Sequence, residues 1–452
     1  MAEQGSTTTS LPPNAILLHA GLPKTGSTAL QSVASAKRPE LLEHGVLYPG
    51  EPRPFHTVAL VSLLRSLSTN PKVRARLARG GLRIWADLLR EVRAEKQRRV
   101  WLSSESVTSA TAAQAAAIAN ELGDRLHVVI TLRPLGDRMM SLWQQRVRRG
   151  RTKVRLDEWM RQVLPAEVGG EPTQRARKYL EFSDKIQRWV DVLGPERVII
   201  VVVDKAKPDQ LYRSFEQLLE LPEGMLDVPA EQRAGMRSNR GMSATEVELA
   251  RRISVAAAEF GLSGADYRRL LHRGAFVRIQ YQRDAAPDEG RLQLSPWAAE
   301  RLRAAAAANI SAIESMGVRV IGDLQSLIEE PRIGEEPEIT SVPIDAAVQA
   351  VLGAVAVATG ADPVATTARA AKKPRKGQGG GAKSGARNEA GAKPAGEAGP
   401  KQAGPRQVGP RQAGAKKPVT KKTPGAPVRR PAAKPPTFTS RVRRRVARMF
   451  GR

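Results

Sequence analysis

Short apolar runs alternate with longer amphipathic stretches along the first half of the chain. The apolar runs predict buried β-strands at 15–20, 45–48, 99–103, 126–132 and 197–203. The stretches between and beside them have helical periodicity at 27–36, 56–67, 111–122, 137–148 and 179–193. Strands that alternate with helices in this way predict an α/β fold with a parallel central sheet flanked by helices.

Helical patterns continue beyond the last predicted strand, at 210–219, 243–260 and 296–316. The sequence from Ser243 to Glu246 reads Ser-Ala-Thr-Glu and predicts a capping box at the start of its helix. The nearly uncharged run at 346–361 is shorter than the roughly 20 residues that a membrane span needs. We therefore predict an amphipathic or peripheral helix there.

The C-terminal residues differ in kind from the rest. Residues 366–452 hold 24 Lys and Arg and 2 Glu, which leaves 49 basic and 43 acidic residues before them. The net charge of +28 therefore belongs mostly to this tail. A tail of Lys, Arg, Ala, Gly and Pro cannot bury a core, so it is predicted to be disordered. The predicted organisation is a flexible N-terminus (1–13), an α/β domain (14–335), a connecting helix or linker (336–365), the disordered tail (366–438) and a basic amphipathic segment (439–452).

Two compositional features bear on the compartment. The chain has no Cys, which excludes disulfides and thiolate metal sites and suits a reducing compartment. Its first residues lack the basic start and apolar centre of a signal peptide. We expect a cytoplasmic protein whose basic amphipathic end contacts an anionic membrane surface. Nucleic-acid association and a solvated charge run are the alternatives for that end.

A candidate anion-binding loop follows the first predicted strand. After Gly21 the sequence reads Pro-Lys-Thr-Gly-Ser-Thr, which comprises Pro23, Lys24, Thr25, Gly26, Ser27 and Thr28. A strand, a Gly-containing loop with one Lys, and then a helix form a phosphate cradle, because backbone N–H groups at the helix start face the anion. Nucleotide-triphosphatase loops place Lys after the last Gly, whereas Lys24 precedes Gly26.

A second candidate motif follows the predicted strand at 126–132. Arg133 comes directly after that strand, and Ser141 lies eight positions later in the helical pattern. Arg133 should therefore lie at the carboxyl end of the strand, with Ser141 about one turn into the next helix. Both then face the sheet edge where open α/β folds bind ligands.

Together the two motifs resemble those of the sulfotransferases that use 3′-phosphoadenosine 5′-phosphosulfate (PAPS), particularly bacterial members, over roughly residues 14–260. The resemblance implies a P-loop-like sulfotransferase fold, PAPS as sulfonate donor and no metal. It implies that the loop binds the 5′-phosphosulfate with Lys24 catalytic, and that Arg133 and Ser141 bind the 3′-phosphate. The late Arg-Lys-Gly motif of eukaryotic members is absent, and the basic loop Arg237-Ser238-Asn239-Arg240, with Arg237 as its binding residue, is the candidate substitute.

The general base is open between two residues. Glu105 follows the predicted strand at 99–103 and so falls at the same sheet edge as the loop. A carboxylate serves as base if burial raises its pKa. His56 is the alternative, and His19 is expected to order the loop.

Three functions are consistent with the sequence. The first is sulfonate transfer to a hydroxyl of a carbohydrate, glycolipid or similar acceptor. The others are an ATP-dependent, kinase-like phosphotransferase and a non-catalytic basic-tailed binding protein. The basic segment from Arg146 to Arg155 suggests an acidic acceptor or, alternatively, a solvated face.

Overall fold

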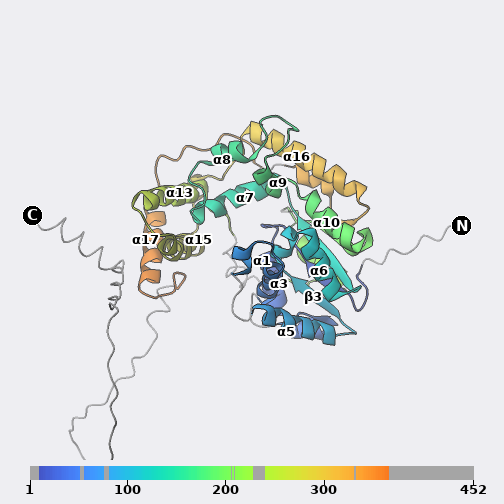
Figure 1. Ribbon diagram of the computed structural model, residues 1–452. Helices are drawn as coiled ribbons and strands as arrows, with labels where there is room; N and C mark the ends of the chain where they lie inside the picture. The colour runs from blue at the N-terminus through green and yellow to red at the C-terminus, as the bar shows by residue number, and fades with distance from the viewer. Residues whose placement is uncertain are drawn as a thin grey trace, which may run out of the picture. The chain divides into compact units, whose positions relative to one another are not determined.

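The computed structural model describes residues 10–50, 55–75, 81–204, 206–207, 209–227, 240–329 and 332–365. The chain divides into two units, Met1–Arg375 and Lys376–Arg452. All described residues belong to the first unit (Figure 1). The predicted disordered tail, its amphipathic end and most of the predicted N-terminal segment lie outside the described residues.

A parallel sheet forms the centre of the fold, as predicted. Within the described residues it has six strands in the order β2-β3-β1-β4-β5-β6. All five strand pairs are parallel, with His19 opposite Ser103 and Ile16 opposite Leu126. The strands are β1 (Ile16–His19), β2 (Val46–Leu47), β3 (Arg99–Ser103), β4 (Leu126–Leu132), β5 (Val198–Val202) and β6 (Arg319–Ile321).

Helices account for most of the remaining structure. Up to residue 219 they are α1 (Ser27–Ala36), α2 (Arg38–Glu43), α3 (Phe55–Ser66), α4 (Pro71–Arg74), α5 (Gly81–Ala94), α6 (Ala112–Leu122), α7 (Leu135–Arg148), α8 (Leu156–Val163), α9 (Gln174–Leu180), α10 (Ser183–Leu193) and α11 (Gln210–Leu219). Later helices are α13 (Ala244–Glu259), α14 (Gly264–Asp266), α15 (Phe276–Gln282), α16 (Pro296–Ser315) and α17 (Ile344–Ala358). Short 3₁₀ segments are η1 (Glu105–Ser109), η2 (Pro195–Arg197), η5 (Pro287–Glu289) and η6 (Leu324–Ile328), and η4 (Tyr267–Ala275) is a π-helix.

Alternate strand residues are buried on opposite faces of the sheet. Leu18, Leu102 and Ile130 pack with α3, α5, α6 and α10 on one face. Leu17 and Trp101 pack with α1 and α11 on the other. Burial on both faces explains why these strands read as continuous apolar runs.

β1 is the point at which the chain changes direction across the sheet. The chain builds β2 and β3 on one side of β1 and then crosses to β4, β5 and β6 on the other. In open α/β sheets the ligand crevice lies at such a switch point, outside the carboxyl ends of the strands. The loops after β1, β3 and β4 all reach this edge.

A third hydrophobic core lies under α7, α13, α15 and α16 and includes Trp143, Trp159 and Phe276. The predicted capping box of α13 is confirmed, since Ser243 Oγ accepts from Glu246 N–H (3.0 Å) and Glu246 accepts from Ser243 N–H (2.9 Å). Next to it, the buried Arg283 guanidinium pairs with Glu246, Glu289 and Asp345.

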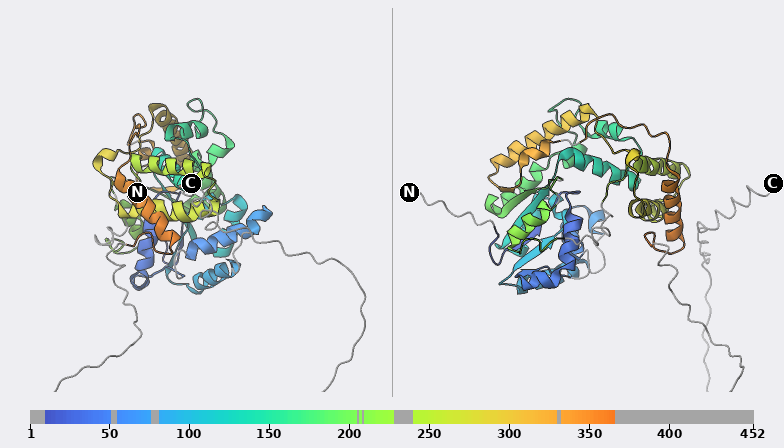
Figure 2. Two further views of the ribbon diagram at one scale, coloured as in Figure 1. Left: turned by 90° about the vertical axis from the view of Figure 1, so that its left-hand side faces the viewer. Right: turned by 180° about the vertical axis from the view of Figure 1, so that it is seen from behind.

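The predicted connecting segment contains α17. This helix packs against η4 and α15, where Ala346, Ala350 and Gly353 are buried (Figures 1 and 2). No helix within the described ranges is long and apolar enough to cross a membrane.

Candidate active site

The loop between β1 and α1 has an unusual backbone. Lys24 has a positive φ of 76° and Gly26, the N-cap of α1, has a φ of 92°. A left-handed conformation is costly for a lysine and marks functional loops. No described side chain caps α1, so Thr25, Ser27 and Thr28 do not take the capping role that their types allow. The Ala29 N–H already bonds Gly26 O (3.0 Å), so an anion would be bound by the N–H groups that precede it, at the very start of α1.

A buried histidine connects the ends of three strands beneath this loop. His19 Nδ1 lies 2.9 Å from Ser103 Oγ, and His19 Nε2 lies 3.2 Å from Thr131 Oγ1. Gln31 Nε2 donates to Ser103 Oγ (3.0 Å). Burial lowers the pKa of His19 to about 3, so the ring is neutral at physiological pH. The role in ordering the loop that the sequence predicted for His19 fits these contacts.

The hydrogen bonds continue from Thr131 into the loop. Thr25 Oγ1 donates to Leu22 O (2.7 Å), so it accepts from Thr131 Oγ1 at 2.6 Å. Thr131 Oγ1 therefore has its own proton engaged and accepts from His19 Nε2–H. With these donor and acceptor assignments, the hydroxyls of Thr25 and Thr131 and the His19 ring all have hydrogen-bond partners. The network therefore holds the loop in this conformation without a ligand.

Gly21 is required where the loop leaves β1. A Cβ at this position would lie 2.5 Å from Ser27 Oγ, 2.5 Å from Thr131 Oγ1 and 2.8 Å from His19 Nε2. All three atoms belong to buried side chains. The absence of a side chain thus permits the close approach of the loop to α1 and β4.

Lys24 and Glu105 are brought together from different strands. Glu105 opens η1 directly after β3, where Ser104 is the N-cap. Burial raises the pKa of Glu105, while Ser27, Lys24 and Arg149 act to lower it. Burial also lowers the pKa of Lys24, assisted by Arg148 and opposed by Glu105. The half-buried Glu105 carboxyl and the Lys24 ammonium are therefore close enough for each charge to act on the other's pKa, although they form no ion pair.

Ser27, the first residue of α1, lies near Glu105. Its Oγ is buried without a hydrogen bond of acceptable geometry to any described residue, although it is close enough to Glu105 to affect that pKa. A buried hydroxyl at the start of α1 is a donor for a bound ligand.

Arg133 joins the second motif to the loop. Its Nη1 donates to Lys24 O at 2.5 Å, and its Nη2 lies 3.3 Å from Asp137 Oδ2. Asp137, which is 1% exposed, also receives Arg332 Nη2 at 3.2 Å. One buried carboxylate therefore positions two guanidinium groups that would otherwise repel each other.

Arg133 and Ser141 lie on the wall of one cavity of about 620 Å³. The same wall carries three further arginines, Arg240, Arg291 and Arg332. The Nε atoms of Arg133, Arg240 and Arg332 are buried and have no acceptor among the described residues. Four arginines against one lining carboxylate, Asp284, make the wall basic, which suits an anion.

Arg240 is held at this cavity by α13. Its Nη1 and Nη2 each lie 2.7 Å from the Glu246 carboxylate, which Arg283 also contacts. Gln144 of α7 bonds the backbone of Met242 and so fixes the loop beside it. Arg237, the predicted substitute for the late family motif, lies outside the described residues.

His56 occupies a structural position. Its Nε2 donates to Pro49 O (2.6 Å), and its Nδ1 accepts from Ser103 N–H (3.2 Å). The ring packs on Tyr48, and burial lowers its pKa to about 4. Because both ring nitrogens are engaged, this geometry favours Glu105 over His56 as the base.

Sequence reasoning missed several site residues. Arg148 and Arg149, at the end of α7, were noted only as part of a basic segment, yet both influence Lys24 electrostatically. Arg291 and Arg332 follow no motif, and only tertiary contacts bring them to the cavity, whereas Arg240 ends the basic loop at 237–240 that the sequence singled out. No cluster of His, Asp and Glu suited to a metal ion occurs in the part of the chain that the structure describes.

Comparisons with known proteins add little to this geometry. No family model matches the chain, and no curated protein matches it. Among solved structures, it is similar to the crystal structure of a sulfotransferase from Alicyclobacillus acidocaldarius, with 16% identity and a TM-score of 0.32. That likeness covers 57% of this chain and 99% of the other. A likeness at this TM-score carries no weight for activity, so the function rests on the site itself.

Proposed function

We propose that this protein is a sulfotransferase that moves a sulfonate group from PAPS to a hydroxyl group of an acceptor. The observation that carries the proposal is the proximity of Lys24 to the half-buried Glu105, together with the hydrogen bond from Arg133, on the cavity wall, to the Lys24 carbonyl. Lys24 and Glu105 suit the sulfonate-bearing, reacting end of the donor. The cavity suits its 3′-phosphate, since guanidinium groups bind phosphate strongly.

The proposed reaction uses the two charged groups in complementary roles. Glu105 removes the proton of the acceptor hydroxyl as its oxygen forms a bond to sulfur. The bond from sulfur to the bridging oxygen of the donor breaks, and that oxygen leaves on adenosine 3′,5′-bisphosphate with a negative charge. Lys24 and the N–H groups at the start of α1 stabilise this charge. The proton remains on Glu105 until solvent removes it.

Arg133 has a positioning role as well as a binding role. Its bond to the Lys24 carbonyl ties the phosphate cavity to the loop, so donor binding at one end orients the other. A donor held at both ends reaches the reactive geometry without further ordering, which is a large part of the rate gain.

The direct test is transfer of radioactive sulfonate from [³⁵S]PAPS to a panel of neutral and acidic glycosides, resolved by chromatography. The full-length protein should label at least one acceptor without added metal. Lys24→Ala should abolish labelling and Glu105→Gln should lower it by about 10²-fold or more, whereas Lys96→Ala and Glu43→Gln, two exposed residues outside the site, should leave it unchanged. Equal labelling by Lys24→Ala and the wild type would refute the proposal.

We also propose that the protein associates with an anionic membrane surface, near a glycolipid or envelope acceptor. α17 exposes an apolar stripe at helical spacing, formed by Ile344 (82% exposed), Val348 (45%), Val351 (62%), Leu352 (44%) and Val355 (51%). The chain that follows Ala365 supplies 24 Lys and Arg against 2 Glu. An apolar stripe joined to dense positive charge is typical of interfacial binding to anionic lipids.

Vesicle sedimentation tests this association. Binding to vesicles with 30% phosphatidylglycerol should exceed binding to pure phosphatidylcholine, and should fall in a Val351→Asn/Val355→Asn variant and in a chain ending at Ala365. Unchanged binding in both variants would contradict the proposal. Binding to duplex DNA but not to either vesicle would assign the tail to nucleic acid instead.

A further inference from the structure

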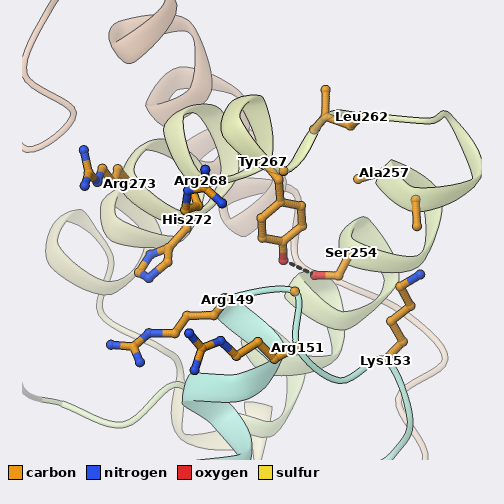
Figure 3. A pocket seen from close by; sticks show the side chains of 13 residues that line it. Arg149, Arg151, Lys153, Ser254, Ala257, Leu262, Tyr267, Arg268, His272 and Arg273 are labelled. Atoms are coloured by element: carbon orange, nitrogen blue, oxygen red, sulfur yellow. Dashed lines mark hydrogen bonds between the residues drawn. The ribbon is translucent and has the colours of Figure 1, made fainter. Parts of the chain in front are cut away.

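A second basic cavity lies between the end of α7 and the π-helix η4 (Figure 3). Its volume of about 430 Å³ is within the range of small-molecule sites, roughly 300–1,000 Å³. Arg149, Arg151 and Lys153 line it from the end of α7 and the loop that follows. Arg268 and Arg273 line it from η4, and no described carboxylate does. We refer to these five side chains as the basic shelf.

The π-helix explains how η4 contributes two arginines to one cavity. Hydrogen bonds in a π-helix join residues five apart, so residues at that spacing lie about one turn apart. Arg268 and Arg273 have this spacing, as do Tyr267 and His272. An α-helix would rotate the second member of each pair away from the first. Helical segments of this kind occur frequently at functional sites.

The shelf cations differ from three neighbouring arginines in making no ion pair. None of the five side chains makes an ion pair or hydrogen bond to another described residue. Their neighbour Arg269, on the same helix, pairs with Asp266, and Arg251 and Arg252 of α13 both pair with Glu248. These three neighbours are ion-paired, whereas the five exposed shelf cations form no ion pair.

The wall behind the shelf is rigid. Tyr267 Oη lies 2.6 Å from Ser254 Oγ and donates to Val147 O (3.2 Å). Gly150, with a φ of 65°, allows the chain to pass the tyrosine ring, since a Cβ there would lie 2.8 Å from Tyr267 Cζ. A wall fixed on both sides makes the cavity a preformed site.

The shelf also adjoins the proposed reaction centre. Burial and Arg151 lower the pKa of Arg149, and Glu105 opposes that effect. Arg149 in turn lowers the pKa values of both Lys24 and Glu105. Arg149, a member of the shelf, is therefore close enough to both reacting groups for its charge to act on them.

We propose that the basic shelf binds an anionic group of the acceptor, so that the substrate class is a small acidic glycoside carrying a carboxylate, sulfate or phosphate near the reacting hydroxyl. This inference rests on the proposed function. The anion pairs with Arg268 and Arg273, and the neighbouring hydroxyl reaches Glu105.

Calorimetric titration of the full-length protein, saturated with adenosine 3′,5′-bisphosphate, tests this assignment. The probes are p-nitrophenyl β-D-glucoside, the matching β-D-glucuronide, and the glucoside 6-sulfate and 6-phosphate. These four differ only at C6, so the neutral glucoside reports the contribution of the anion. Whichever anionic probe binds most tightly identifies the anion that the shelf prefers.

The wild type should bind at least one anionic probe tenfold or more tightly than the neutral glucoside. The preference should disappear in Arg268→Gln/Arg273→Gln and remain in the matched control Arg269→Gln. Equal affinity for all four probes in the wild type would overturn the inference. If adenosine 3′,5′-bisphosphate itself did not bind, the proposed function would fail instead, and the two failures are thus distinct.

Discussion

Replacing Gly21 with alanine should distort the loop between β1 and α1 and weaken donor binding. The new Cβ would lie 2.5 Å from the hydroxyls of Ser27 and Thr131, whereas ordinary contacts begin at 3.4 Å. Each oxygen must therefore retreat by about 0.9 Å. Thr131 cannot do so freely, because its hydroxyl bonds Thr25 and His19.

The magnitude follows from these contacts. Overpacking of a close-packed site costs about 1–3 kcal/mol, and a buried polar group that loses its partner costs about 1–3 kcal/mol more. We expect Gly21→Ala to lower the free energy of unfolding by about 2–6 kcal/mol. A loop shifted by about 1 Å should also lower the transfer rate by about 100-fold.

Urea unfolding and [³⁵S]sulfonate transfer measure the two effects on the same preparations. Gly123→Ala is the matched control, since Gly123 has a φ of 75° and its Cβ would meet nothing within 4 Å. It should cost about 1–3 kcal/mol of backbone strain, because φ 75° with ψ −165° is a conformation open essentially to glycine alone, and it should leave transfer unchanged. A Gly21→Ala protein with wild-type stability and transfer would refute the packing account of the loop.

Three further predictions concern charge. Glu105→Gln should lower kcat/KM by about 10²–10⁴-fold. In the wild type, kcat/KM should fall at acidic pH as Glu105 is protonated, at a pH above the usual carboxyl range because burial raises the Glu105 pKa. This fall should be absent from the pH–rate profile of Glu105→Gln, and its persistence would exclude Glu105 as the base. Asp137→Asn should lower the free energy of unfolding measured in urea by about 3–5 kcal/mol, because Arg133 and Arg332 lose their shared buried carboxylate. It should also weaken binding of adenosine 3′,5′-bisphosphate, and unchanged binding would show that Asp137 does not position these arginines for the ligand. The folded pKa of His19 is about 3, so below pH 6.5 the unfolded state binds more protons than the folded state. The free energy of unfolding should therefore fall by about 1.4 kcal/mol per pH unit, or about 2 kcal/mol by pH 5. His19→Gln should show a smaller loss of stability between pH 7 and pH 5, and an equal loss would contradict this assignment.

The sheet could be predicted largely because its strands are buried on both faces. β3 and β4 have the predicted bounds, since their apolar runs end at polar residues. β6 was missed because Arg319–Ile321 is short and only partly buried, so its sequence carries no distinct apolar run. It forms by pairing with β5, a contact between distant segments.

One helix boundary depends on a distant residue. The predicted helix at 179–193 is interrupted, so that α9 ends at Leu180 and α10 begins at Ser183. Asn309 of α16 causes the break, because its Oδ1 accepts from the N–H groups of Phe182 and Ser183 (2.8 Å each) and its Nδ2 donates to Leu180 O (3.0 Å). A cap supplied from 126 residues away has no local signal.

In the candidate site, too, some residues could be predicted from local sequence and others depend on contacts between distant segments. Lys24, Glu105 and Arg133 follow strands, and parallel strands bring their carboxyl ends to one edge, so sequence order alone groups them. Arg332 and the basic shelf depend on how α13, η4 and α16 pack on α7, and on a π-helix that no local pattern announces. The roles of the grouped residues remain predictions that binding and kinetics test.

Calorimetric titration of the full-length protein with adenosine 3′,5′-bisphosphate, without metal, tests the central claim most directly. We predict micromolar binding that is lost in Lys24→Ala and in Arg133→Ala and retained in Lys96→Ala, because the loop and the arginine cavity would hold the two ends of one ligand. No binding by the wild type, together with binding of ATP–Mg²⁺, would contradict the account and assign the loop to a nucleoside triphosphate.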